Sequence, residues 1–103
     1  MGPDDNDVFP GRLVEGRFTH IRDGDTIEIN GIPVRLAKLD CAEMGTSQGA
    51  VAKRRMLQLA ARQSGSCTLT GRRSYDRWIG ECSLQDGRDV GDVMLQEGVC
   101  ARY

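Results

Sequence analysis

The dipeptide Asn30-Gly31 constrains the fold more than any other part of this sequence. It lies between two short runs rich in β-branched and aliphatic residues, T-I-E-I at 26–29 and I-P-V-R-L-A-K-L at 32–39. Asn-Gly is among the strongest signals for a two-residue hairpin, because both residues readily adopt the positive φ of a type I′ turn. A similar run at 12–21 precedes the acidic turn Asp23-Gly24-Asp25. The sequence therefore predicts a meander of three strands joined by two tight turns.

A helix is predicted between residues 48 and 63. Apolar residues recur there at helical spacing, and cations occupy the opposite side. We expect Ser47 to cap this helix and Ser64-Gly65 to end it. The residues expected to face the core are Val51, Ala52, Met56, Leu59 and Ala60.

The remainder of the chain predicts a second hairpin and a second helix. The short apolar runs at 67–70 and 79–84 read as its two strands. Asp89 is the expected cap of a short helix at 90–97, and the tail at 99–103 returns as an extended segment. The fold class is therefore mainly β with two helices, an α+β chain.

Five short strands with a helix between the third and the fourth is the element order of the OB-fold, a small Greek-key barrel. We therefore expect a five-stranded barrel. A chain of 103 residues is long enough for one domain. The polar residues 1–11, which include Pro3 and Pro10, predict a loose arm, and residues 12–103 then form the single domain.

Net charge limits how this chain can recognise nucleic acid. The formal net charge is -1 and the isoelectric point is about 5.8, the wrong sign for a protein that coats nucleic acid electrostatically. Any phosphate recognition must therefore be local. No apolar run approaches the roughly 18 residues that cross a membrane, and the N-terminal residues show no targeting segment. We expect no membrane partner.

The four cysteines, Cys41, Cys67, Cys82 and Cys100, contain no C-x-x-C pair, which argues against a structural zinc site. Three disulfide pairings are possible. Cys67 and Cys82 lie in the two strands of the second hairpin, where pairing would make them near-opposite neighbours. We therefore favour Cys67 with Cys82, which leaves Cys41 with Cys100, and an oxidising compartment. Four buried thiols in a cytosolic protein are the alternative.

Carboxylates recur at the ends of the predicted strands. Asp25 opens the second strand and Asp40 closes the third, and a meander places these two strand ends side by side. Converging oxygen ligands of this kind suit a hard cation such as Ca²⁺. Glu43 follows three residues later, within reach as a base for a metal-held water. The alternative is a plain hairpin turn at Asp23-Gly24-Asp25, with loop carboxylates at the other two positions.

Arg35 lies in the middle of the third predicted strand. If the carboxylates form a site, its fixed fork of donors suits a phosphate oxygen, although a solvated strand face would explain it equally well. Simple alternation puts Arg35 and Asp40 on opposite faces, so they converge only if the strand bends between them. The single His20 has no cysteine or serine partner in a recognisable motif, which argues against a histidine-based nuclease or a triad.

Five motifs carry a family resemblance that runs from about residue 12 to the C-terminus: R-D-G-D-T-I-E-I, V-R-L-A-K-L-D-C-A-E, the helix opening G-A-V-A, S-Y-D-R-W-I-G-E-C and V-G-D-V-M-L-Q-E-G-V-C-A-R-Y. Together they resemble the staphylococcal nuclease (thermonuclease) family. The resemblance implies an OB-fold barrel and a calcium-dependent phosphodiesterase, an endonuclease that acts on single-stranded or flexible DNA and RNA. A metal-associated water would attack phosphorus in line and release the 5′ oxygen.

The resemblance also assigns a role to each residue of the candidate site. Asp25 and Asp40 would hold the calcium ion, together with the backbone carbonyl of Cys41. Glu43 would act as the general base or position the attacking water. Arg35 and a second arginine would bind the phosphate and stabilise charge at phosphorus. The set is completed by Arg77 as the second arginine, Asp23 behind the metal ligands and Tyr75 beside the nucleotide.

Three features depart from the family pattern. The acidic motif usually reads D-T-P-E or D-A-P-E, whereas this chain has D-C-A-E at 40–43 and lacks the stiffening proline. The second arginine usually lies in D-x-Y-G-R. Matching Tyr75 to the family tyrosine places Arg77 in the arginine position, whereas matching Asp76 to the family aspartate deletes that position. The family's C-terminal helix and the tyrosines after its second helix have no counterpart here, which predicts weaker base stacking.

The sequence thus predicts a secreted or periplasmic, monomeric, calcium-dependent nuclease whose signal peptide would lie outside this sequence. The alternative is a family member that keeps the barrel and binds nucleic acid or protein without cutting. The cluster of like charges favours activity, because a scaffold has little reason to keep it, whereas the acidic isoelectric point favours the alternative. A role in surface polysaccharide synthesis is a third possibility, since some bacterial relatives carry such names, but no residue here indicates sugar chemistry.

Overall fold

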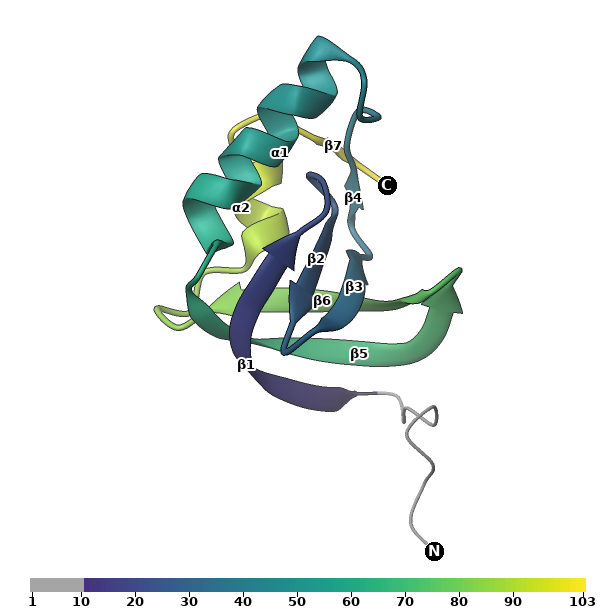
Figure 1. Ribbon diagram of the computed structural model, residues 1–103, viewed down its shortest axis with the longest axis vertical. Coiled ribbons are helices and arrows are strands. Elements are labelled where there is room, and N and C mark those ends of the chain that lie inside the picture. The colour runs from purple at the N-terminus through teal and green to yellow at the C-terminus, as the bar shows by residue number, and fades with distance from the viewer. Residues whose placement is uncertain (1–10) are drawn as a thin grey trace, which may run out of the picture.

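The computed structural model describes residues 11–103, so the predicted N-terminal arm lies almost wholly outside the described residues (Figure 1). Two helices and a main sheet of five strands confirm the predicted α+β class, and two further strands are very short. In chain order the elements are β1 (Arg12–Ile21), β2 (Thr26–Ile29), β3 (Ile32–Leu36), β4 (Leu39–Asp40), α1 (Ser47–Ala60), β5 (Ser64–Ser74), β6 (Arg77–Leu84), α2 (Val90–Gln96) and β7 (Ala101–Arg102).

The five longer strands close into a barrel in the order β1-β2-β3-β6-β5. β1 closes it because its two halves have different partners: residues 12–17 pair with β5, and residues 18–21 pair with β2, both antiparallel. A shift of register between Phe18 and His20 bends the strand where it changes partner. β3 and β6 pair in parallel, which brings the middle of β3 beside the start of β6.

The Asn30-Gly31 hairpin forms as predicted. Asn30 and Gly31 have φ angles of 50° and 77°, both positive as a type I′ turn requires. The Asn30 side chain also reaches back to β1, where it accepts a hydrogen bond from the Arg17 amide at 3.2 Å and donates one to the Glu15 carbonyl at 3.0 Å. Gly16 makes this contact possible, because a Cβ there would lie 2.1 Å from the Asn30 side chain.

The third strand is shorter than predicted. It ends at Leu36 rather than Leu39, and the chain turns at Ala37-Lys38 before β4 begins. The turn follows from long-range pairing, because the Leu36 amide donates to the Asp25 carbonyl at 2.8 Å and the Ala37 amide donates to the Gly80 carbonyl at 2.9 Å. β4 then leaves the barrel and pairs with β7 in a separate two-stranded sheet (Figure 1).

α1 begins one residue earlier than predicted. Thr46, not Ser47, is its N-cap, and the Thr46 hydroxyl accepts a hydrogen bond from the Gly49 amide at 3.0 Å. The prediction for Val51 is wrong, since its side chain is 45% exposed. The other four residues expected to face the core are buried, namely Ala52, Met56, Leu59 and Ala60.

The end of α1 is also earlier than predicted. The helix ends at Ala60 rather than Gln63, because Arg62 adopts a φ of 65° and its amide already bonds to the Phe18 carbonyl of β1. Ser64-Gly65, expected to end the helix, are instead the first residues of β5.

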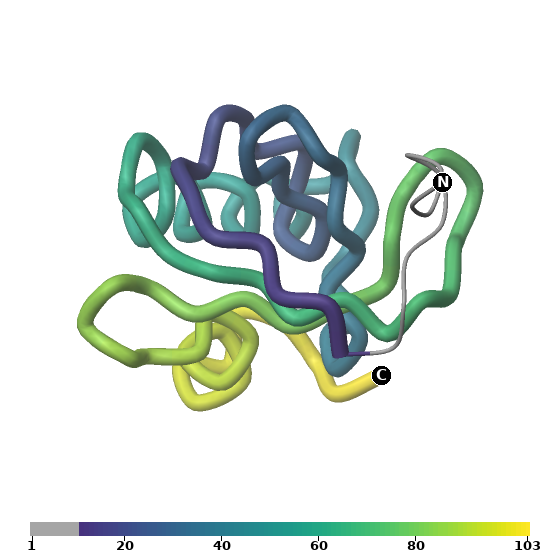
Figure 2. Tube along the Cα trace, turned by 90° about the horizontal axis from the view of Figure 1, so that it is seen from below, coloured from purple at the N-terminus to yellow at the C-terminus, as the bar shows by residue number. Residues whose placement is uncertain are grey.

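The second hairpin is longer than predicted. Its strands cover residues 64–74 and 77–84 rather than 67–70 and 79–84, and the turn between them projects from the barrel in both views (Figures 1 and 2). Asp89 caps α2 as predicted, accepting a hydrogen bond from the Asp92 amide at 2.9 Å.

Both favoured disulfides form, so none of the four cysteines is free. Cys67–Cys82 links directly paired residues of β5 and β6. Cys41–Cys100 joins the end of β4 to the start of β7 across a separation of 59 residues. In the described part of the chain, neither helix is long and apolar enough to cross a membrane.

Candidate functional site

Asp25 is the residue around which the predicted site residues gather. It directly precedes β2, and its side chain is only 13% exposed. Its Oδ2 accepts a hydrogen bond from the Cys41 amide at 3.2 Å and lies 3.5 Å from Nη2 of Arg35. The structure therefore brings three of the predicted residues together, from the acidic turn, from β3 and from the segment after β4.

The surroundings of Asp25 disfavour the charged form of its side chain. Burial raises the pKa of Asp25, and the neighbouring Asp23 carboxyl raises it further, while Arg35 and the Cys41 amide act in the opposite direction. Asp23 is tied to the turn, since its Oδ1 accepts a hydrogen bond from the Asp25 amide at 3.1 Å. The surroundings of Asp25 thus favour its neutral form more than water does.

Arg35 is fixed from both sides because β3 lies between β2 and β6. Its pairing partners are Thr26 and Ile79. The guanidinium, whose side chain is 15% exposed, donates to the Leu36 carbonyl and lies 5.6 Å from the centre of the Tyr103 ring. Tyr103 was not among the predicted site residues, and no local pattern marks it, because β7 brings it here from the far end of the described chain.

Arg77 reaches the same site through Thr26. Its Nη1 donates to the Thr26 hydroxyl at 3.1 Å, and its other two nitrogens donate to the carbonyl and the hydroxyl of Ser74 at 3.1 and 2.9 Å. The Thr26 hydroxyl in turn donates to Oδ1 of Asp25 at 3.4 Å. Arg77 is therefore two hydrogen bonds away from Asp25, and its remaining N–H groups can donate to a ligand.

Tyr75 and Asp76 form the turn that presents Arg77. The Tyr75 ring is 90% exposed and its centre lies 5.8 Å from the Arg77 guanidinium. Asp76 does not contact Arg77 by a hydrogen bond, but accepts two from Arg22. Sequence reasoning missed Arg22 and Thr26, both of which lie inside the acidic motif that it had singled out.

Asp40 and Glu43 flank Cys41, and both side chains are exposed. Neither carboxylate forms a hydrogen bond or ion pair with another of residues 11–103, so the structure places them near Cys41 without joining them to Asp25. The Glu43 backbone is nevertheless fixed, because its carbonyl accepts a hydrogen bond from the Thr46 hydroxyl at 2.6 Å. Within 11–103 no group of three or more His, Cys, Asp or Glu residues is placed to hold a metal ion.

A hollow of about 240 Å³ opens between Arg35 and Arg72. Its lining combines two cations, an exposed aromatic ring and a hydroxyl with an apolar floor. The lining residues are Arg35, Ala37, Arg72, Ser74, Ile79 and Tyr103. Such a lining suits an anion that carries a planar group.

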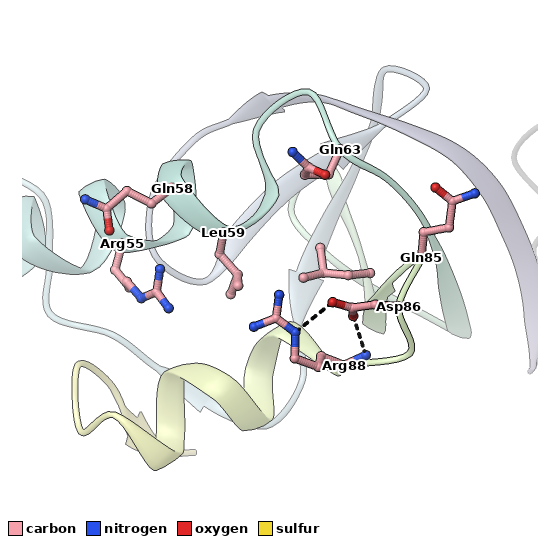
Figure 3. A pocket seen from close by; sticks show the side chains of 8 residues that line it. Arg55, Gln58, Leu59, Gln63, Gln85, Asp86 and Arg88 are labelled. Carbon is pink, nitrogen blue, oxygen red and sulfur yellow. Dashed lines mark hydrogen bonds and ion pairs between the residues drawn. The ribbon is translucent and has the colours of Figure 1, made fainter.

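A second hollow, of about 380 Å³, shares no residue with the first (Figure 3). Arg55 and Arg88 line it, but each is engaged by a carboxylate, Glu97 at 2.6 Å and Asp86 at 3.0 Å. Both arginines of the second hollow are therefore neutralised by carboxylates on the surface.

The chain is similar to three bacterial proteins over most of its length. It is 29% identical over 94 residues to an uncharacterized endonuclease of Escherichia coli O157:H7, a match that covers 87% of this chain and 61% of the relative. It is 31% identical over 100 residues to a micrococcal nuclease of Shigella flexneri, covering 85% and 58%. It is 33% identical over 87 residues to the succinoglycan biosynthesis protein ExoI of Rhizobium meliloti (strain 1021), covering 74% and 46%.

This chain therefore spans between about half and three fifths of the length of these relatives. It matches no protein-family model.

Proposed function

We propose that this chain is a nuclease of the staphylococcal nuclease type, a phosphodiesterase that cleaves single-stranded or flexible DNA or RNA. The observation that carries the proposal is the linkage of Arg35, Asp25 and Arg77, through one ion pair and the Thr26 hydroxyl. The names of two of the similar proteins, an endonuclease and a micrococcal nuclease, support it. The closed five-stranded barrel supports an assignment to the OB-fold.

The two arginines would bind the scissile phosphate. Both guanidiniums are oriented by the protein, Arg35 by Asp25 and the Leu36 carbonyl, and Arg77 by Thr26 and Ser74. Donors fixed before the reaction can stabilise the negative charge that develops on the phosphate oxygens without reorganising. The position of Arg77 supports the sequence alignment in which Tyr75 matches the family tyrosine.

A calcium ion would fit beside Asp25, because a cation there would stabilise the charged form that burial and Asp23 disfavour. Asp40 and the Cys41 carbonyl would complete the protein ligands. Only two carboxylates would contribute, so water molecules would fill the remaining coordination positions. Hard cations such as Ca²⁺ accept water oxygens as ligands. Bound there, the ion would neutralise charge on the phosphate.

Glu43 would accept the proton of the attacking water. Its carboxylate forms no ion pair within residues 11–103 and so keeps its acceptor capacity, while its backbone is anchored to the start of α1. The hollow beside Arg35 would hold the neighbouring nucleotide, with the Tyr103 ring as a stacking surface. Tyr75, beside the Arg77 guanidinium, would contact the nucleotide as well. The two disulfides support a secreted or periplasmic location.

Cleavage of a single-stranded DNA oligonucleotide with calcium, and with a chelator, tests the proposal. We expect Glu43→Gln to lose roughly 10² to 10⁴ in rate, the usual worth of a general base. Glu15→Gln makes the same change at an exposed carboxylate of β1 and should keep full activity. Absence of calcium-dependent cleavage by the wild-type protein would contradict the proposed nuclease activity.

A binding module is the second candidate. It is favoured by the absence, within residues 11–103, of any group of three metal-ligating side chains. Oligonucleotide binding measured by fluorescence anisotropy, without cleavage under any metal condition, would establish this function instead.

A further inference from the structure

Arg22 and Asp76 form a bidentate ion pair at the edge of the candidate site. Nη1 and Nη2 of Arg22 lie 3.1 and 2.9 Å from the two carboxylate oxygens of Asp76, which follows 54 residues later in the chain. Nε of Arg22 donates to Glu28 at 2.9 Å. All three guanidinium nitrogens are therefore anchored, which fixes the direction in which Asp76 is held.

Each partner directly precedes a segment of the site. Arg22 precedes the acidic turn, and Asp76 precedes Arg77 in the turn between β5 and β6. In the same turn Tyr75 has a φ of 59°, a conformation that few residues other than glycine adopt. This turn therefore needs support from outside the hairpin to keep one conformation.

Two side-chain links provide that support among the described residues. One is the ion pair, and the other is the hydrogen bond from Arg77 to Thr26. The ion pair is partly exposed, with 33% of the Arg22 side chain and 65% of the Asp76 side chain accessible. An exposed pair adds little to global stability, so its effect is local to the turn.

We infer that the Arg22–Asp76 ion pair is a clamp that positions Arg77 against Thr26 and Asp25. The inference rests on the proposed function, because it makes Arg22 and Asp76 positioning residues for the phosphodiester cleavage. Neither side chain touches the reacting groups; each acts through Arg77.

A purely electrostatic role for Asp76 makes the opposite prediction. A carboxylate beside a phosphate site repels the substrate, so removing its charge would lower KM and leave kcat unchanged. A positioning role predicts that kcat falls while KM changes little, because Arg77 acts on the transition state.

Trp78 fluorescence tests the clamp without any substrate. Trp78 is the single tryptophan of the chain, is 8% exposed and follows Arg77 in β6, with the Arg73 guanidinium stacked on it at 4.2 Å. Acrylamide is a neutral quencher, so its access to Trp78 reports loosening of the hairpin rather than a change in charge. For Asp76→Asn we expect a quenching constant at least about 1.5-fold above wild type, because local opening becomes more frequent.

The kinetic test compares Asp76→Asn with a matched control, Asp86→Asn. Asp86 is also an exposed carboxylate paired with an arginine, Arg88, at 3.0 Å, but it lies in the second hollow (Figure 3). We expect kcat to fall about 10-fold for Asp76→Asn, since a 1 Å misplacement can cost roughly 100-fold. Asp76→Glu, which keeps the charge, should recover part of the loss, and Asp86→Asn should match wild type.

The double variant Arg22→Gln/Asp76→Asn should lose less than the sum of the two single variants, because both changes remove the same ion pair, while Arg22→Gln also removes the hydrogen bond to Glu28. Melting temperatures should stay within about 8 °C of wild type, as an exposed ion pair allows. Wild-type quenching in Asp76→Asn would overturn the clamp whether or not the chain cuts DNA, and so would an unchanged kcat with a lower KM. A wild type that does not cleave contradicts the proposed function instead, and raised quenching then still supports the clamp.

Discussion

The hydroxyl of Thr26 lies 3.1 Å from Nη1 of Arg77 and connects that guanidinium to Asp25. Thr26 is 1% exposed and is the single buried polar side chain in the described core. A buried hydroxyl is retained at low cost only when its hydrogen bonds are made, and here it both donates and accepts. Thr26 therefore joins the acidic turn to β6 from inside the barrel.

Replacing Thr26 with valine should separate Arg77 from Asp25 while preserving volume. We expect a loss of about 1 to 3 kcal/mol in the free energy of unfolding, because Arg77 keeps a donor without its acceptor. Urea denaturation measures this loss. Thr68→Val is the control, since Thr68 is exposed on β5. A Thr26→Val protein as stable as the Thr68→Val protein would contradict the role given to the hydroxyl.

The parts of the fold that were predicted correctly are those specified by neighbouring residues. The bounds of β1 and β2 match because the turns at Asp23-Gly24-Asp25 and Asn30-Gly31 end them locally. The end of β3 was wrong because the Leu36 and Ala37 amides bond to distant carbonyls. The end of α1 was wrong for the same reason.

The residues of the candidate site also fall into those indicated by local sequence and those placed by long-range pairing. Asp25 and Arg35, which were both singled out from the sequence as candidate site residues, lie within one ion pair, although that pair itself was not predicted. Simple alternation does not apply to Arg35 and Asp40, because the chain turns at residues 37–38 and the two residues lie in different strands. Tyr103 lies beside Arg35 because β4 pairs with β7. The favoured Cys41–Cys100 bridge brought the tail close to residue 41, but no sequence pattern indicated the register of this pairing.

Removing the charge of Asp25 should stabilise the metal-free protein. The carboxylate is largely buried beside Asp23, and its raised pKa means that folding disfavours the charged form. For Asp25→Asn in chelator we expect a gain of about 0.5 to 2 kcal/mol, the usual range for a stabilising substitution. Asp40→Asn, at an exposed carboxylate, should change little. A less stable Asp25→Asn would show that Arg35 neutralises the charge after all.

The two disulfides should contribute unequally to stability. Cys41–Cys100 closes a separation of 59 residues and Cys67–Cys82 one of 15. Loop-closure entropy predicts losses of about 4 and about 3 kcal/mol when each pair is replaced by alanine. Denaturant titration of the two double variants measures the difference. Cleavage should fall more without Cys41–Cys100, because Cys41 adjoins Asp40 and bonds to Asp25. Free thiols in denatured, unreduced protein would refute both bridges.

Glu81 should make stability depend on pH. Its Oε1 is buried without a hydrogen-bond partner among the described residues, and burial raises its pKa. The charged groups that face it are Lys38, Asp89, Asp92 and Arg102. The folded state binds the Glu81 proton more tightly than the unfolded state does. Protonated Glu81 therefore contributes its full share to the free energy of unfolding below the ordinary pKa of 4.5, and this share is lost as pH rises through the higher pKa of the folded state.

Glu81→Gln should remove this loss of stability with rising pH, because glutamine does not titrate. Its stability should therefore fall less than that of wild type between pH 4.5 and neutral pH, as measured by urea denaturation across that range. Glu15→Gln, at an exposed carboxylate of β1, should retain the wild-type pH dependence. Parallel curves for wild type and Glu81→Gln would exclude Glu81 as the source.

Alanine at position 49 tests how Glu43 is anchored. Gly49 lies in the first turn of α1, where alanine would favour the helix by about 1 kcal/mol on propensity alone. A Cβ there would, however, lie 2.0 Å from the Glu43 carbonyl oxygen. We expect Gly49→Ala to lower both the melting temperature and cleavage, because the Glu43 backbone must move. Gly91→Ala in α2 is the control, since its Cβ would meet side-chain atoms at 3.1 Å that can shift. If Gly49→Ala were the more stable protein, helix propensity would outweigh the contact, and Glu43 would not be fixed by α1.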